Sequence, residues 1–121
     1  MKKILIIEDE PDIAEMLKMM VESKGYVADY ALDARKGMGL IKSHDLLLLD
    51  IIMPNMSGRE VLVEMKKKGI KTPTIVVSAV GLPEEVEREL KIKYPEVEFV
   101  SKTHLREELM SKIKIMLSKK R

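Results

Sequence analysis

The chain has 121 residues, of which 45% are hydrophobic and 35% charged, and its formal net charge is +2 at pH 7. This length suits one domain with a single core, and so small a charge argues against direct contact with nucleic acid or an anionic membrane. The absence of cysteine excludes disulfides, thiolate metal sites and thiol catalysis. No apolar stretch approaches the roughly 20 residues that span a bilayer, and no cleavable signal follows Lys2 and Lys3. We therefore expect a cytoplasmic protein.

Strand and helix patterns alternate along the chain. Short apolar or alternating runs predict strands at residues 4–7, 26–31, 46–49, 74–78 and 97–100. Apolar residues at helical spacing predict helices that begin at Pro11, Asp33, Ser57 or Gly58, Pro83 and near Leu105. We expect Gly25 to cap the end of the first helix, and the second to reach about Ile41. This alternation favours a parallel sheet with helices on both faces.

Asp50 is the most informative residue, because it ends an uninterrupted run of four leucines from Leu46 to Leu49. Such a run is typical of a buried parallel strand. A carboxylate on its last residue lies at the carboxyl edge of the sheet, where open α/β folds bind ligands. The structural alternative is that Asp50 only caps the turn that follows.

Other polar residues also fall at the ends of predicted strands. Glu8 and Asp9 follow the first strand, Ser78 ends the fourth, and Lys102 follows the fifth. If the first and third strands are neighbours, Glu8, Asp9 and Asp50 meet at the switch point of the sheet. Three like charges at close range destabilise one another unless a cation lies among them. Mg²⁺, a hard dication that prefers oxygen ligands, is the expected occupant.

This arrangement predicts phosphoryl chemistry on Asp50. A carboxylate beside Mg²⁺ and the Lys102 ammonium can attack a phosphoryl group and retain it, since both cations neutralise oxygens that carry charge during transfer. The hydroxyl of Ser78 would donate a hydrogen bond to a phosphoryl oxygen.

The whole chain resembles the receiver domain of two-component response regulators. The matching features are the acidic pair Glu8-Asp9, the segment Leu49-Asp50-Ile51-Ile52-Met53-Pro54 with Gly58, the pair Ser78-Ala79, and Lys102. The resemblance implies one receiver domain over residues 1–121, acting without an output domain. It also implies a flavodoxin-like (βα)₅ fold with strand order 2-1-3-4-5. Two positions depart from the family pattern: Thr103 stands where a proline usually follows the lysine, and 93–96 replaces a small Gly-Ala pair.

The resemblance further implies the role of each site residue. Asp50 accepts phosphate from a sensor histidine kinase. Mg²⁺ binds to Asp9, Asp50 and the backbone carbonyl of Ile52, with Glu8 acting mainly through water. After phosphorylation Ser78 swings toward the phosphate and Phe99 turns inward. The face formed by the fourth helix, fifth strand and last helix then binds a downstream protein or a second copy of the chain.

Two other functions remain open at this point. A phosphorelay intermediate, which passes phosphate to a histidine on another protein, would use the same site residues. An aspartyl-phosphate phosphatase usually carries a second aspartate two residues after its nucleophile, but that position here is Ile52. The position two residues after Ser78 is Val80, which is also apolar. We therefore expect no enzyme activity beyond self-phosphorylation from a phosphodonor and slow loss of the phosphoryl group.

Overall fold

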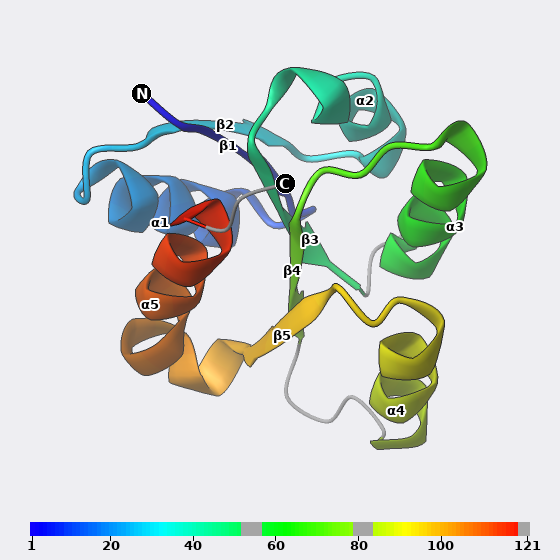
Figure 1. Cartoon of the computed structure of the whole chain (residues 1–121). Helices are drawn as coiled ribbons and strands as arrows, with labels where there is room; N and C mark the ends of the chain where they lie inside the picture. The colour runs from blue at the N-terminus through cyan, green and yellow to red at the C-terminus, as the bar shows by residue number, and fades with distance from the viewer. Residues whose placement is uncertain (52–56, 79–83, 119–121) are drawn as a thin grey trace.

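The computed structural model describes residues 1–51, 57–78 and 84–118, and in these ranges strands and helices alternate as predicted (Figure 1). The strands are β1 (Lys3–Ile7), β2 (Val27–Ala31), β3 (Leu46–Asp50), β4 (Thr74–Ser78) and β5 (Glu98–Ser101). The α-helices are α1 (Pro11–Glu22), α2 (Ala34–Met38), α3 (Gly58–Lys68), α4 (Glu84–Lys93) and α5 (Leu105–Ser118). Two 3₁₀ helices are η1 (Ile41–Ser43) and η2 (Lys102–His104).

All neighbouring strands of the sheet are parallel, in the order β2-β1-β3-β4-β5. This order confirms the predicted doubly wound, flavodoxin-like fold. The winding of the sheet reverses between β1 and β3, which makes this the switch point. The register there pairs Ile7 with Leu49, so Glu8 and Asp50 are the next residues on adjacent strands.

Helices cover both faces of the sheet, with α1 and α5 on one side and α2, α3 and α4 on the other (Figure 1). The four leucines of β3 are all buried and divide between these faces. Leu46 and Leu48 pack into the core on the α1–α5 side, and Leu47 and Leu49 into the core under α2 and α3. Successive side chains of a strand point to opposite faces, so a strand buried on both sides is apolar throughout. Among the described residues, no helix is both long and apolar enough to cross a membrane.

The ends of the first two helices differ from the prediction. Helix α1 ends at Glu22, and Gly25 lies beyond its cap in the following turn with φ of +93°, so the expected glycine cap is wrong. Asp33 does cap α2, because its carboxylate accepts hydrogen bonds from the backbone N–H of Arg35 and Lys36. The helix nevertheless ends at Met38 instead of Ile41, and the chain continues into η1. Two glycines within about one turn lower the helical propensity of this segment.

Helix α3 begins as the sequence indicates. The hydroxyl of Ser57 accepts a hydrogen bond from the backbone N–H of Glu60, and the Glu60 carboxylate accepts one from the backbone N–H of Ser57. This reciprocal capping box satisfies two helix-terminal donors. Gly69, with φ of +69°, ends the helix in the left-handed conformation that glycine adopts at least cost. The caps therefore define where α3 begins and ends.

Candidate functional site

Three carboxylates meet at the carboxyl edge of the sheet, next to the switch point. Glu8 and Asp9 follow β1, and Asp50 is the last residue of β3. One carboxylate oxygen from each residue lies within 4.8 Å of the other two. The sequence prediction that these residues converge is therefore confirmed, and the parallel pairing of β1 with β3 is the cause.

Two of these carboxylates are almost fully buried. Glu8 is 1% exposed and Asp50 is 3% exposed, whereas Asp9 is half-buried. Burying a charge is costly unless it is paired or coordinates a metal. The site therefore concentrates negative charge where solvent screening is weak.

Lys102, the first residue of η2, brings a positive charge to this cluster. Its Nζ lies 3.1 Å from Glu8 Oε1 and 3.7 Å from Asp50 Oδ2. Burial by itself lowers the pKa of Lys102, but the contact with Glu8 and the attraction of Asp50 and Glu8 outweigh burial. The pKa of Lys102 is therefore raised above its ordinary value of 10.5, so the side chain is a fixed cation at neutral pH.

The cluster keeps one oxygen suited to a further cation. Glu8 Oε1 has no hydrogen bond from any described residue, although Lys102 Nζ lies 3.1 Å away, because the direction of this contact departs from hydrogen-bond geometry. The other oxygen, Oε2, accepts a hydrogen bond from the backbone N–H of Glu10 at 3.2 Å. An unsatisfied buried carboxylate oxygen beside two more carboxylates is a donor set that fits a hard dication such as Mg²⁺.

Gly58, the first residue of α3, packs against the backbone of Asp50 and Ile51. A β-carbon on Gly58 would clash with the carbonyl oxygen of Asp50 and would lie 2.6 Å from Cα of Ile51, so no side chain fits there. The N–H of Gly58 donates a 3.1 Å hydrogen bond to the carbonyl oxygen of Ile51. The first turn of α3 thus packs directly on the end of β3. The sequence showed Gly58 only as part of a motif; this packing role depends on a tertiary contact.

Phe99 lies in the core under α4. It is 8% exposed and packs with Leu90 of α4. The ammonium of Lys91 lies 5.4 Å from the centre of the Phe99 ring, and Lys112 of α5 donates a 2.8 Å hydrogen bond to the Phe99 carbonyl. Helices on both faces therefore contact this residue of β5.

The remaining predicted residues lie at the ends of β4 and β5 or outside the described part of the chain. Ser78 is the last residue of β4 and pairs with Ser101 of β5, but its side chain lies outside the part of the chain that the structure describes. Ile52 and Val80 also lie outside the described residues. Thr103, which replaces the usual proline, lies in η2, where its backbone N–H donates to the Ser101 hydroxyl at 3.2 Å. This short helix carries Lys102 into the acidic cluster.

Comparisons with known proteins agree with this geometry. The family model for the response regulator receiver domain matches residues 4–114. The response regulator ArlR of Staphylococcus saprophyticus is 30% identical over 119 residues, which cover 97% of this chain and 53% of that protein. The transcriptional regulatory protein DltR of Streptococcus agalactiae is 39% identical over 79 residues, covering 64% of this chain and 35% of that protein. The chain thus spans about half or less of these relatives' length.

Solved structures show the same fold. The receiver domain of Francisella response regulator 1452 superimposes with a TM-score of 0.83 at 27% identity, covering 97% of each chain. A chain from the complex of histidine kinase ThkA with response regulator protein TrrA gives a TM-score of 0.82 at 33% identity, covering 98% of this chain and 100% of that one. The acidic cluster, the strand order and the family match lead to one conclusion: the chain belongs to the receiver domains of two-component response regulators.

Proposed function

We propose that this chain is a phosphorylation switch in which Asp50 accepts a phosphoryl group from a sensor histidine kinase. The observation that carries the proposal is the position of Asp50, buried at the switch point with two carboxylates within 4.8 Å and the Lys102 ammonium 3.7 Å away. Residues 1–121 act as one receiver unit in this proposal, and its cytoplasmic location follows from the need to meet such a kinase.

The transfer forms one bond and breaks one bond. A carboxylate oxygen of Asp50 attacks phosphorus, the phosphorus–nitrogen bond of the phosphohistidine breaks, and the imidazole leaves with the bonding electron pair. The products are an aspartyl phosphate on Asp50 and an unmodified kinase histidine. Lys102 then faces the new phosphoryl oxygens with its positive charge, and the Ser78 hydroxyl donates a hydrogen bond to one of them.

Asp9, Asp50 and the carbonyl of Ile52 would hold Mg²⁺, with Glu8 contributing through water. When bound, the ion supplies positive charge to the phosphoryl oxygens. The support for this part of the proposal is the donor set of the cluster and the buried Glu8 oxygen that lacks a hydrogen bond among the described residues.

The output of the switch would be a change in the face formed by α4, β5 and α5. Phe99 of β5 is in contact with both helices of this face, because the ammonium of Lys91 of α4 lies over its ring and Lys112 of α5 donates a hydrogen bond to its carbonyl. A phosphoryl group on Asp50 would draw Ser78 toward it, and movement at the end of β4 would change the packing around Phe99. A shift in population toward the rearranged state then creates the binding surface.

The kinase is the partner with the most support, because one similar structure holds a response regulator bound to a histidine kinase. A downstream protein, or a second copy of the chain after phosphorylation, would bind the α4–β5–α5 face. Direct binding to nucleic acid or membrane is not expected of these residues, whose net charge is only +2.

The phosphoryl chemistry is tested by intact mass measurement after incubation with Mg²⁺ and acetyl phosphate. We expect one added phosphoryl group on the wild type, none on Asp50→Asn, and none when a chelator removes the metal. Glu96→Gln, at the opposite edge of the sheet, serves as the control and should be phosphorylated like the wild type. An adduct that persists on Asp50→Asn would contradict the assignment.

The switch is tested separately by backbone NMR of the phosphorylated and unphosphorylated chain. We expect shift changes at Phe99 and along α4 and α5, in addition to those near Asp50. Changes confined to the acidic cluster would leave the chemistry intact but refute the proposed output.

The same samples test the phosphatase alternative. Ile52 and Val80 offer no acid or base for water attack, so we expect the phosphoryl group to decay slowly. A lifetime of seconds for the isolated protein would favour an enzyme instead.

A further inference from the structure

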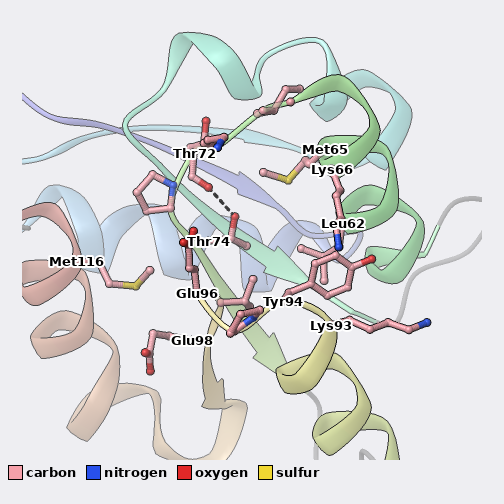
Figure 2. Close-up of a pocket in the computed structure, with 16 residues that line it drawn as sticks. Leu62, Met65, Lys66, Thr72, Thr74, Lys93, Tyr94, Glu96, Glu98 and Met116 are labelled. Carbon is pink, nitrogen blue, oxygen red and sulfur yellow. Dashed lines mark hydrogen bonds between the residues drawn. The ribbon is translucent and has the colours of Figure 1, made fainter. Parts of the chain in front are cut away.

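A groove lies at the amino edge of the sheet, at the opposite end of the strands from Asp50. Its volume is about 940 Å³. The second half of α3 forms one wall, the connection between α4 and β5 forms another, and Met116 of α5 closes the far end (Figure 2). This volume is within the range of about 300–1,000 Å³ that is usual for small-molecule sites.

The inner surface of the groove is apolar. The half-buried side chains of Ile70, Tyr94 and Val97 line it. The core residues Leu62, Met65 and Met116 also contribute but are at most 6% exposed (Figure 2). Apolar area in a groove favours a ligand with an apolar body, because binding removes that area from water.

The α3 side of the groove carries Lys66 and Lys71, whereas the other side carries Glu96, Glu98 and Lys93, of which Lys93 is paired with Glu89 at 3.7 Å. Lys66 and Lys71 have no carboxylate within 4.0 Å among the described residues, and the Lys66 ammonium lies 5.8 Å from the Tyr94 ring centre. On the β5 side, Glu98 is paired with Lys112 at 3.6 Å, and only the exposed Glu96 lacks such a partner. A ligand would therefore meet two uncompensated cations on the α3 side and one carboxylate on the other.

We propose that this groove binds a small amphiphilic carboxylate. Its apolar body lies on Ile70, Tyr94 and Val97, and its carboxylate lies on the α3 side, at Lys66 or Lys71, away from Glu96. A neutral apolar compound would use the inner surface but not the cations. A small anion without an apolar body would meet only exposed lysines, which bind weakly in water. The site does not depend on phosphorylation of Asp50, which lies at the other edge of the sheet.

The test is a titration of the ¹⁵N-labelled full chain, followed by NMR at constant pH and ionic strength. Octanoate is the probe, used below the concentration at which it forms micelles. Acetate has the same charge without the apolar body, and 1-octanol has the apolar body without the charge. We expect saturable shifts at Lys66, Tyr94 and Val97 with octanoate, and much weaker binding of acetate and octanol. No saturable shift with octanoate, or equal binding of octanol, would refute the proposal.

A pair of charge variants locates the carboxylate. The double variant Lys66→Gln with Lys71→Gln should raise the Kd for octanoate about fivefold, the scale expected for exposed ion pairs. The control is Lys67→Gln with Lys68→Gln, which removes the same charge from neighbouring exposed residues that do not line this groove. Equal Kd values for the two double variants, or octanoate shifts centred on another surface, would refute the site.

Discussion

The two edges of the sheet differ in whether the hydrogen bonds of their buried polar side chains are satisfied within the protein. Four polar residues of the described chain are buried: Glu8 and Asp50 at the carboxyl edge, and His44 and Thr74 at the amino edge. At the amino edge both are satisfied within the protein. His44 lies with Nδ1 2.8 Å from the Leu40 carbonyl and Nε2 2.8 Å from Asp29, and Thr74 donates to the Thr72 carbonyl.

At the carboxyl edge the same fold leaves Glu8 Oε1 without a hydrogen bond from the described residues and relies on Lys102 to offset the negative charge. A buried polar group without its hydrogen bond costs stability, and such groups are rare in native proteins. The comparison teaches that the buried polar side chains of the amino edge are satisfied within the protein, whereas the carboxyl edge keeps a buried Glu8 oxygen without a hydrogen bond from the described residues. Variants at the two edges test this contrast.

The largest effect is expected from Lys102→Met. Without the ammonium, Glu8 and Asp50 are buried charges without their cation, and breaking such a pair costs about 3 kcal/mol of unfolding free energy. Urea unfolding without metal measures this loss. Lys114→Met, an exposed position on α5, is the matched control and should change stability by less than about 0.5 kcal/mol. If both variants unfold alike, the carboxyl edge does not depend on Lys102.

The contribution of Lys102 should also depend on pH in a defined direction. Its pKa is raised in the folded protein, so the stabilisation is fully present below the ordinary value of 10.5 and is lost as pH rises through the higher folded value. The stability difference between wild type and Lys102→Met should therefore be constant near neutral pH and shrink above about pH 10.5. A difference that shrinks toward acidic pH only would indicate that the carboxylates dominate.

Mg²⁺ should stabilise the protein through the carboxyl edge alone. At a concentration of 100 times the Kd, an ion that binds only the folded state adds about 2.7 kcal/mol. Thermal unfolding in MgCl₂, compared with NaCl of equal ionic strength, measures this gain. Asp9→Asn should abolish most of it, whereas Glu96→Gln at the amino edge should retain it. Equal gains in both variants would place the ion elsewhere.

Gly58→Ala tests the contact that holds the end of β3. The added β-carbon would lie within 2.6 Å of backbone atoms of Asp50 and Ile51, which cannot move as a flexible side chain does. Overpacking of this kind costs about 2 kcal/mol, and we expect slower phosphorylation as well because Asp50 shifts. Gly39→Ala is the control, since its nearest contact would be an ordinary 3.8 Å. Similar stability for both variants would contradict the packing argument.

The smallest effect is expected from the ion pair between α3 and α4. Arg59 lies 2.6 Å from Glu89, but their side chains are 45% and 43% exposed, so water screens the attraction. A double-mutant cycle with Arg59→Ala and Glu89→Ala should give a coupling of about 0.5 kcal/mol or less. A coupling several times larger would show that exposed charges here matter as much as the buried ones at the carboxyl edge.

Much of the fold could be predicted from local patterns. The four leucines before Asp50 and the helical spacing after Pro11 indicated the correct elements, because strand and helix periodicities are properties of short segments. The prediction was wrong where helix ends depend on single residues. The second helix stopped at Met38 instead of Ile41, and Gly25 lay outside the first helix.

The sequence predicted which residues come together at the site but not how they contact one another. The positions of Glu8, Asp9, Asp50 and Lys102 at strand ends indicated that they would meet. The sequence did not show that Lys102 lies closer to Glu8 than to Asp50, or that Gly58 packs on the Asp50 carbonyl. These contacts depend on where η2 and α3 lie, and no local pattern contains that information.

By itself, the sequence determined which residues end strands and therefore which chemistry the protein can carry, because strand burial and side-chain alternation are encoded within a few consecutive residues. The distances between these residues depend on how the elements pack in three dimensions. Register between β1 and β3 placed Glu8 beside Asp50, and the packing of α3, α5 and the α4–β5 connection formed the groove at the other edge. The reason is that ion pairs and grooves depend on distances of a few ångströms, and only folding brings segments that are far apart in the sequence so close together.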